Sequence, residues 1–161
     1  MLDLRPPRNQ ADPRAIAWWT VQGLVATALL AIPALVAFAL LTDRPGWLAA
    51  LLGALCAGLL ALALVGPRAQ YRFSRWEVTD QAVYTCSGWL FRSWRIAPMS
   101  RIQTVDTARG PLQRLFGLSD VTVTTASSAG AIKIEGLHHA LADDLAERLT
   151  AITQATPGDA T

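Results

Sequence analysis

Charged side chains are missing from two long stretches of the sequence. Residues 16–41 include no Asp, Glu, Lys or Arg over 26 positions, and residues 46–66 include none over another 21. A helix needs about 20 apolar residues to cross a hydrocarbon core about 30 Å thick, so each stretch is long enough to span a membrane. Buried helices of a soluble bundle are the alternative, but they seldom lack every charge over so many turns. A signal peptide does not fit the first stretch, which is too long and is followed at once by a second.

Residue types and motifs that carry chemistry are also scarce. The chain has two cysteines, Cys56 in the second apolar stretch and Cys86 outside it, and we expect both to be free thiols. It has no Gly-rich phosphate loop and no HExxH, CxxC or GxSxG motif. His138 and His139 are expected at the start of a helix, where adjacent side chains point about 100° apart and cannot hold a metal together. We therefore predict no catalytic residues, no metal site and no cofactor, and a protein that is not an enzyme.

The basic residues predict the orientation of the two apolar stretches. Only residues 42–45 separate them, so the helices must run antiparallel and both chain ends must lie on one side of the membrane. Three arginines precede the first stretch, three follow the second and one lies in the turn: Arg5, Arg8, Arg14, Arg68, Arg72, Arg75 and Arg44. Basic residues favour the cytoplasmic side, which places both termini in the cytoplasm and the hairpin in the plasma or bacterial inner membrane.

Small residues recur every four positions in the second stretch, at Ala49, Gly53, Ala57 and Ala61. This spacing lets two helix backbones approach closely, either within the hairpin or between the chain and a partner. Neither stretch carries an acidic or basic side chain that would mark an ion pathway or a proton relay. The hairpin is therefore predicted to be an anchor.

From residue 71 onward, short alternating segments separated by turn residues indicate β-structure. We expect strands at about 71–78, 82–87, 92–97, 101–107, 121–124 and 131–135, a helical turn or compact loop at 112–117, and an amphipathic helix at about 138–152. The predicted domains are a cytoplasmic N-terminal segment (1–15), a transmembrane helical hairpin (16–66), a cytoplasmic domain (67–153) and a disordered tail (154–161). The terminal helix is expected to close one open end of the sheet structure.

Four segments of the second half carry a family resemblance. They are residues 78–80 (VTD), 87–92 (SGWLFR), 96–105 (IAPMSRIQTV) and 110–118 (GPLQRLFGL). Together they resemble the bacterial pleckstrin-homology domain family, also called the YdbS-like or DUF304 family, over about residues 71–150. The resemblance implies an α+β membrane protein, with a two-helix transmembrane hairpin followed by a pleckstrin-homology-like (PH-like) β-sandwich or barrel. That domain would have about seven antiparallel strands, capped by a C-terminal helix. The resemblance implies no catalytic or binding residues.

Basic residues suggest where the domain makes contact. Residues 66–137 carry nine basic and five acidic side chains, a net charge of +4 beside an anionic leaflet. Each basic group held near such a surface contributes about 1 kcal/mol. Residues 89–95 also interleave aromatic and basic side chains at an expected hairpin, which would suit a membrane interface. We favour the alternative, in which Trp89, Leu90, Phe91 and Trp94 are core residues and the arginines are solvated. The candidate membrane-surface or ligand contacts are Arg68, Arg72, Arg75, Trp89, Phe91, Arg92, Trp94 and Arg95.

These features predict a membrane-anchored, noncatalytic PH-like binding or scaffold module at the cytoplasmic face, which recognises a protein partner or anionic headgroups. The alternatives are an accessory subunit of a larger membrane complex and, less favoured, an enzyme of envelope or lipid metabolism. The expected partners are the lipid bilayer and either another protein or a second copy of the chain as a homo-oligomer. Nucleic acid is not expected as a partner, because the domain is tethered to the membrane and has one lysine.

Overall fold

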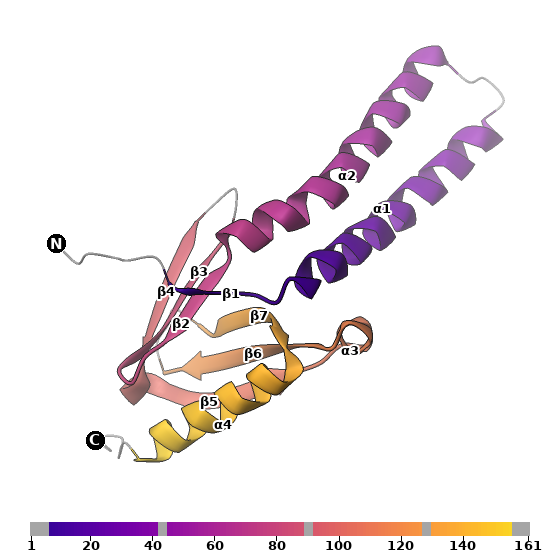
Figure 1. Cartoon of the computed structure of the whole chain (residues 1–161). Helices are drawn as coiled ribbons and strands as arrows, with labels where there is room; N and C mark the ends of the chain where they lie inside the picture. Colours follow the sequence, from indigo (N-terminus) through magenta and orange to yellow (C-terminus); the bar gives the residue numbers. More distant parts are fainter. Residues whose placement is uncertain (1–6, 42–44, 89–91, 127–129, 156–161) are drawn as a thin grey trace. The chain divides into compact units, whose positions relative to one another are not determined.

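The computed structural model describes residues 7–41, 45–88, 92–126 and 130–155 (Figure 1). The chain divides into two compact units. One unit is a helical hairpin, Ile16–Ala69. The other unit combines Met1–Ala15 with Gln70–Thr161, so it is built from both sides of the hairpin in sequence.

The hairpin consists of α1 (Arg14–Leu40) and α2 (Gly46–Phe73). Both helices are long and apolar enough to cross a membrane, and only 0% and 6% of their most apolar windows are buried. A core helix of a soluble protein would be mostly buried, so this exposure favours contact with lipid. Cys56 on α2 and Cys86 are free cysteines, as predicted.

Helix α2 continues beyond the expected end of the apolar stretch at Gly66. It reaches Phe73, and the amide of Ser74 donates to the carbonyl of Gln70 at 2.8 Å. The prediction that a strand begins at Tyr71 was therefore wrong. Each residue added to an existing helix gains a hydrogen bond, whereas the alternation at residues 71–73 is too short to separate strand from helix.

A close approach holds the hairpin together at Gly23 of α1 and Ala63 of α2. A Cβ atom added at Gly23 would lie 3.1 Å from Ala63 Cβ and 3.2 Å from Ala63 Cα, which is closer than the usual carbon–carbon contact. The small-residue stripe on α2 does not make this contact at Gly53, where an added Cβ would meet nothing within 4 Å. The sequence predicted that this stripe packs either within the hairpin or against a partner. At Gly53, packing within the hairpin is not observed.

The second unit contains two antiparallel sheets (Figure 1). The four-stranded sheet has the order β1 (Asn9–Gln10), β2 (Arg75–Val78), β3 (Ala82–Ser87) and β4 (Ser93–Pro98). The three-stranded sheet has the order β5 (Ile102–Ala108), β6 (Leu118–Thr125) and β7 (Ile132–His138). The short helix η1 (Met99–Arg101) links the sheets, α3 (Pro111–Phe116) joins β5 to β6, and α4 (His139–Ala155) follows β7. No strand pair joins the two sheets within the described residues, so they form a sandwich and not a closed barrel.

Six strands match those expected after residue 70, but β1 comes from the N-terminal segment. Asn9 pairs with Trp76 and Gln10 with Arg75, and the Trp76 indole Nε1 donates to the Gln10 carbonyl at 3.2 Å. The segment before the first span is thus part of the sheet. Helix α4 ends at Ala155, and the remaining residues of the predicted disordered tail, 156–161, lie outside the described residues.

One core joins both sheets and α4. It contains Val83 and Ala97 from the first sheet, Val121 from the second, and Leu145 and Leu149 from α4. Leu149 is fully buried, and burying a side chain of this size contributes about 1.5–3 kcal/mol. The terminal helix therefore closes the sandwich, as the sequence predicts.

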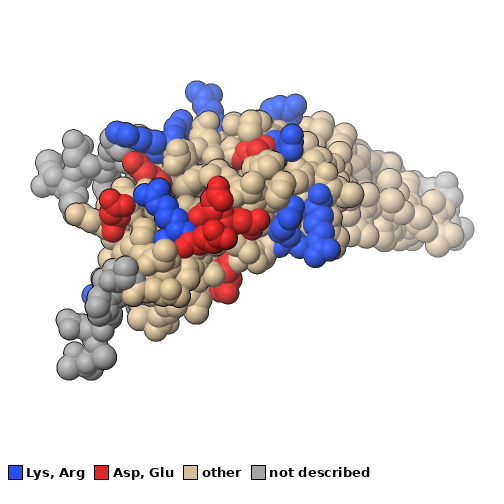
Figure 2. Space-filling model, turned by 60° about the horizontal axis from the view of Figure 1, so that its bottom comes forward, with Lys and Arg blue, Asp and Glu red and all other residues tan. Residues whose placement is uncertain are grey.

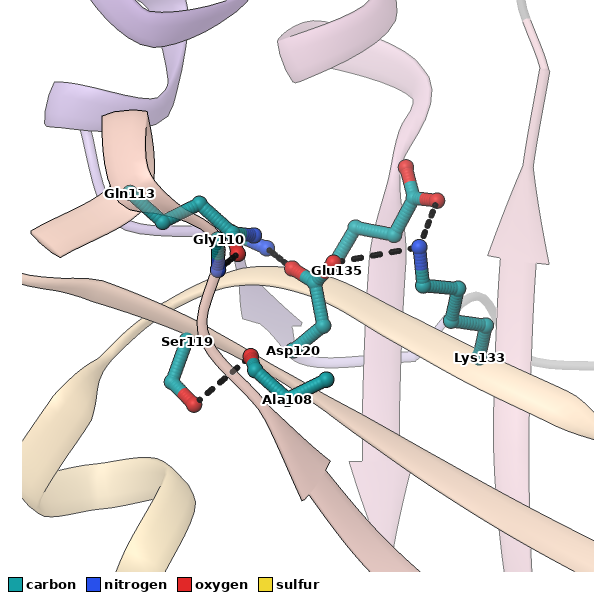
Figure 3. Close-up of polar contacts among 8 residues, drawn as sticks. Ala108, Gly110, Gln113, Ser119, Asp120, Lys133 and Glu135 are labelled. Atoms are coloured by element: carbon teal, nitrogen blue, oxygen red, sulfur yellow. Dashed lines mark hydrogen bonds and ion pairs between the residues drawn. The ribbon is translucent and has the colours of Figure 1, made fainter.

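A polar network around Asp120 fixes the N-terminal segment to β7 (Figure 3). In the β6–β7 ladder Ser119 pairs with Leu137 and Val121 with Ile134, so two residues of β7 oppose Asp120. The buried Asp120 carboxylate accepts the Gly136 amide at 2.9 Å, and Gly136 has the left-handed backbone expected of a bulge glycine, with φ of 68°. The Gly136 carbonyl in turn accepts the amide of Asp12 at 2.8 Å.

Lys133 completes this network. Its ammonium lies 3.1 Å from Asp120 Oδ2 and 3.0 Å from Glu135 Oε1. Burial by itself lowers the pKa of Lys133, but its hydrogen bonds to Glu135 and Asp120 and their negative charges outweigh burial. The pKa of Lys133 is therefore raised above its ordinary value of 10.5.

We predict that Gly23→Leu destabilises the hairpin. A larger side chain forces α1 and α2 apart, and overpacking typically costs about 1–3 kcal/mol. The thermal midpoint of the full-length protein in mild detergent should fall by several degrees. Gly53→Leu is the matched control and should leave the midpoint unchanged, because an added Cβ there meets open space. Equal falls in thermal midpoint for both variants would contradict the close packing of Gly23 against Ala63.

We predict that Lys133→Met destabilises the protein in a pH-dependent way. The raised pKa means that the contribution of Lys133 is complete below its unfolded pKa of about 10.4 and is lost as pH rises through the folded pKa. The variant should therefore have the lower thermal midpoint at pH 8, where the Asp120 carboxylate lacks its cation. The difference in thermal midpoint between the variant and the wild type should become smaller above about pH 10.4. A gap that stays constant up to pH 12 would show that the ammonium charge is not responsible.

Candidate functional site

Three of the predicted contact residues lie where the chain passes from α2 into the first sheet. Arg68 and Arg72 are exposed on α2, and Arg75 is half-buried at the start of β2. Arg92 is exposed just before β4, which contains Trp94 and Arg95. The other two predicted residues, Trp89 and Phe91, lie outside the described residues.

Arg92, just before β4, lies against the last residue of α2. Its guanidinium carbon lies 5.1 Å from the centre of the Phe73 ring, within the range of a cation–π interaction. Phe73 is the last residue of α2 and follows Arg72 directly. Arg92 therefore lies beside the end of α2, and we use the term exit surface for the three arginines around this end, Arg72, Arg75 and Arg92.

Strand β4 forms an edge of the four-stranded sheet. Trp94 and Ile96 occupy alternate positions and are 37% and 47% exposed. The interpretation of Trp94 as a core residue was therefore wrong. Arg95 is engaged within the protein, because its guanidinium donates to the Ala131 carbonyl at 2.8 Å. Arg95 thus contributes to holding β4 in place.

Charge is unevenly distributed over the second unit. Helix α4 carries three acidic residues and one basic residue, Asp143, Asp144, Glu147 and Arg148. Figure 2 looks from the side on which α4 lies and shows acidic side chains gathered in the middle of this face, with basic side chains around them. An anionic surface would repel this acidic group, so the face of α4 is the least suited to meet a membrane.

The two adjacent histidines have a structural role. His138 ends β7 and His139 begins α4, so the expectation that both start the helix holds only for His139. The His139 amide donates to the Gly117 carbonyl at 3.0 Å, and its Nδ1 lies 3.2 Å from the same oxygen. In the parts of the chain that the structure describes, no three His, Cys, Asp or Glu side chains gather as a metal site would require.

Sequence reasoning missed a second basic surface at α3. Leu115 is 82% exposed there, and Arg109 and Arg114 are exposed beside it. The signal in the sequence is the alternation of arginines with apolar residues in 109–116. Periodicity in so short a segment does not show which apolar residues face solvent.

Comparison with known proteins shows which family the chain matches. The model of the bacterial PH domain family matches residues 20–153. The chain is also 28% identical over 156 residues to the UPF0699 transmembrane protein YdbS of Bacillus subtilis (strain 168), and the alignment covers 95% of this chain and 97% of that protein. No solved structure matches the chain.

These comparisons agree with the observed architecture. The relative is named as a transmembrane protein, and this chain has two helices long and apolar enough to span a membrane. The two antiparallel sheets and α4 follow these helices, as the resemblance to the family implies. This is a membrane protein with transmembrane helices, and the chain belongs to the bacterial PH domain family.

Proposed function

We propose that this protein is a membrane-anchored, noncatalytic PH-like module whose exit surface binds anionic lipid headgroups at the cytoplasmic face of the cell membrane. The observation that carries the proposal is the contact between Arg92 and Phe73. It adds a distant arginine to the basic residues that follow the second span.

Distance from the apolar stretch supports headgroup contact. Arg72 lies six residues after Gly66 on the same helix, which corresponds to about 9 Å along the helix axis. This distance is close to the Debye length of about 8 Å at physiological salt, over which a basic residue still senses the leaflet. At about 1 kcal/mol for each arginine near the surface, the exit surface is expected to add a substantial attraction to an anionic leaflet.

The side of the membrane follows from the arginines around the spans. Three precede the first apolar stretch and three follow the second, against one in the turn. This bias favours the cytoplasm for both termini and therefore for the PH-like unit. The acidic phospholipids of the cytoplasmic leaflet would then be within reach of the exit surface.

A noncatalytic role is supported by the chemistry of the side chains. The sequence has no catalytic motif, and the described carboxylates with the closest contacts serve the fold, as Asp120 does in the β6–β7 bulge. Lys133 is engaged by Asp120 and Glu135. The family and the relative also favour a protein without catalysis.

A second candidate function is recognition of a protein partner at β4. Among the described residues β4 is the last strand in the order of the four-stranded sheet, and Trp94 and Ile96 are exposed on it. An extended peptide can add to such an edge and fill the space beside alternate side chains. This candidate predicts binding that does not depend on the charge of the lipid.

We predict that an anionic lipid stabilises the full-length protein through the exit surface. Short-chain phosphatidylglycerol should raise its thermal midpoint in neutral detergent more than phosphatidylcholine with the same chains, because a ligand of the folded state stabilises it. The difference should shrink as salt is added. The triple variant Arg72→Gln, Arg75→Gln, Arg92→Gln should lose most of the difference between the two lipids.

The control for this experiment is Arg148→Gln. Arg148 is an exposed arginine on the acidic helix α4, where it pairs with Asp80 at 3.4 Å. This variant removes one positive charge far from the exit surface in sequence and should keep the preference for phosphatidylglycerol. Equal stabilisation of the wild type by both lipids would refute headgroup binding and favour the protein-partner function.

A further inference from the structure

Leu115 has the most unusual exposure of any apolar residue outside the hairpin. Its side chain is 82% exposed, more than Leu40 of the apolar helix α1 at 79%. Outside α1 and α2, no other large apolar side chain among the described residues is more than half exposed. A single exposed leucine is common on protein surfaces, so the charged side chains near it decide what this one is suited to contact.

Arginines lie close to Leu115 in sequence and at the C-terminal end of α3. Arg114 precedes Leu115, and Arg109 lies just before α3, with its Nε donating to the Leu118 carbonyl at 3.3 Å. A third arginine comes from the N-terminal segment, since Arg14 Nη1 lies 3.5 Å from the position that a Cβ atom on Gly117 would take. An apolar tip bordered by cations fits the interface of an anionic membrane.

The contact with Arg14 also locates α3 near the point where the chain enters the membrane. Arg14 is followed two positions later by Ile16, at which the stretch without charge begins. The N-terminal segment is fixed on the PH-like unit here, because the Asp12 amide donates to the Gly136 carbonyl and the Asp12 carboxylate accepts the Arg14 amide, both at 2.8 Å. The C-terminal end of α3 therefore lies beside Arg14, two residues before the stretch without charge begins.

Helix α3 is held in one conformation by its own polar contacts. The Gly110 amide donates to Gln113 Oε1 at 2.6 Å, and the Gln113 side chain is buried. Gly117 ends the helix in the left-handed conformation, with φ of 68°, and its carbonyl accepts the His139 amide. Leu115 is thus presented by a fixed turn, which lowers the entropy lost on binding.

We propose that α3 is a second membrane contact, in which Leu115 enters the interface of the bilayer while Arg14, Arg109 and Arg114 bind its anionic headgroups. This inference rests on the proposed function, because it requires the PH-like unit to lie against an anionic leaflet. It adds an apolar anchor at the entry of the first span to the basic exit surface at the end of the second. The chain would then be fixed to the leaflet at two points.

The test measures the depth of position 115 in the full-length protein. In a Cys56→Ala, Cys86→Ser background, a spin label on Leu115→Cys is compared in nanodiscs with and without phosphatidylglycerol. Insertion of about 5–10 Å predicts high collision rates with oxygen and severalfold lower rates with a water-soluble nickel chelate in the anionic nanodiscs. A label on Leu141→Cys is the control, since Leu141 is 44% exposed on the acidic helix α4, and it should remain accessible to nickel.

Two other outcomes would overturn the inference. Equal access of nickel to labels at 115 and 141 would show that α3 stays in water. Protection of position 115 from both oxygen and nickel, whatever the lipid, would show that protein covers it. If the exit-surface variant still loses the lipid preference in either case, the proposed function stands and only the contact at α3 fails.

A second variant tests the inference without labels or cysteine replacement. Leu115→Glu places a negative charge on an exposed side chain and should reduce the extra stabilisation of the full-length protein by phosphatidylglycerol. Leu141→Glu makes the same change on α4 and should not. If both variants keep the full preference while the exit-surface variant loses it, α3 does not contact the lipid.

Discussion

The exclusion of charge from hydrocarbon is the constraint on which the rest of the molecule depends. An acidic or basic side chain at the middle of a spanning helix costs about 2.5–3.5 kcal/mol on insertion scales. Residues 16–41 and 46–66 obey this limit, so the arginines nearest to them lie at the ends of the spans. The exclusion of charge from the spans therefore places positive charge at their ends, next to the two chain segments that form the PH-like unit.

The chain segments that precede and follow the hairpin are held within the PH-like unit by noncovalent contacts. On the N-terminal side, β1 pairs with β2 and Asp12 donates to Gly136. On the C-terminal side, the Phe73 ring lies beneath Arg92. These contacts fix the N-terminal segment and the last residue of α2 on the PH-like unit. The acidic charge of helix α4 suits a position away from an anionic leaflet.

Much of this architecture is predictable from the sequence because its signals are long or periodic. The two apolar stretches, strands β2 to β7 and the terminal helix all have such signals. Strand β1 has two residues and depends on its pairing with Trp76, far away in sequence. The bulge at Gly136 likewise depends on a carboxylate on another strand. The exposure of Leu115 and Trp94 could not be predicted, because an apolar residue in a short segment looks the same whether it is core or surface.

We propose that the basic faces of the PH-like unit lie on an anionic leaflet. Hydrogen–deuterium exchange of the full-length protein in neutral and anionic nanodiscs is a direct test of this placement, because all segments are followed in one measurement. Exchange should be slower in anionic lipid at residues 92–95 and 111–117 and unchanged in α4. Identical exchange in the two lipids, or slowing confined to α4, would contradict it.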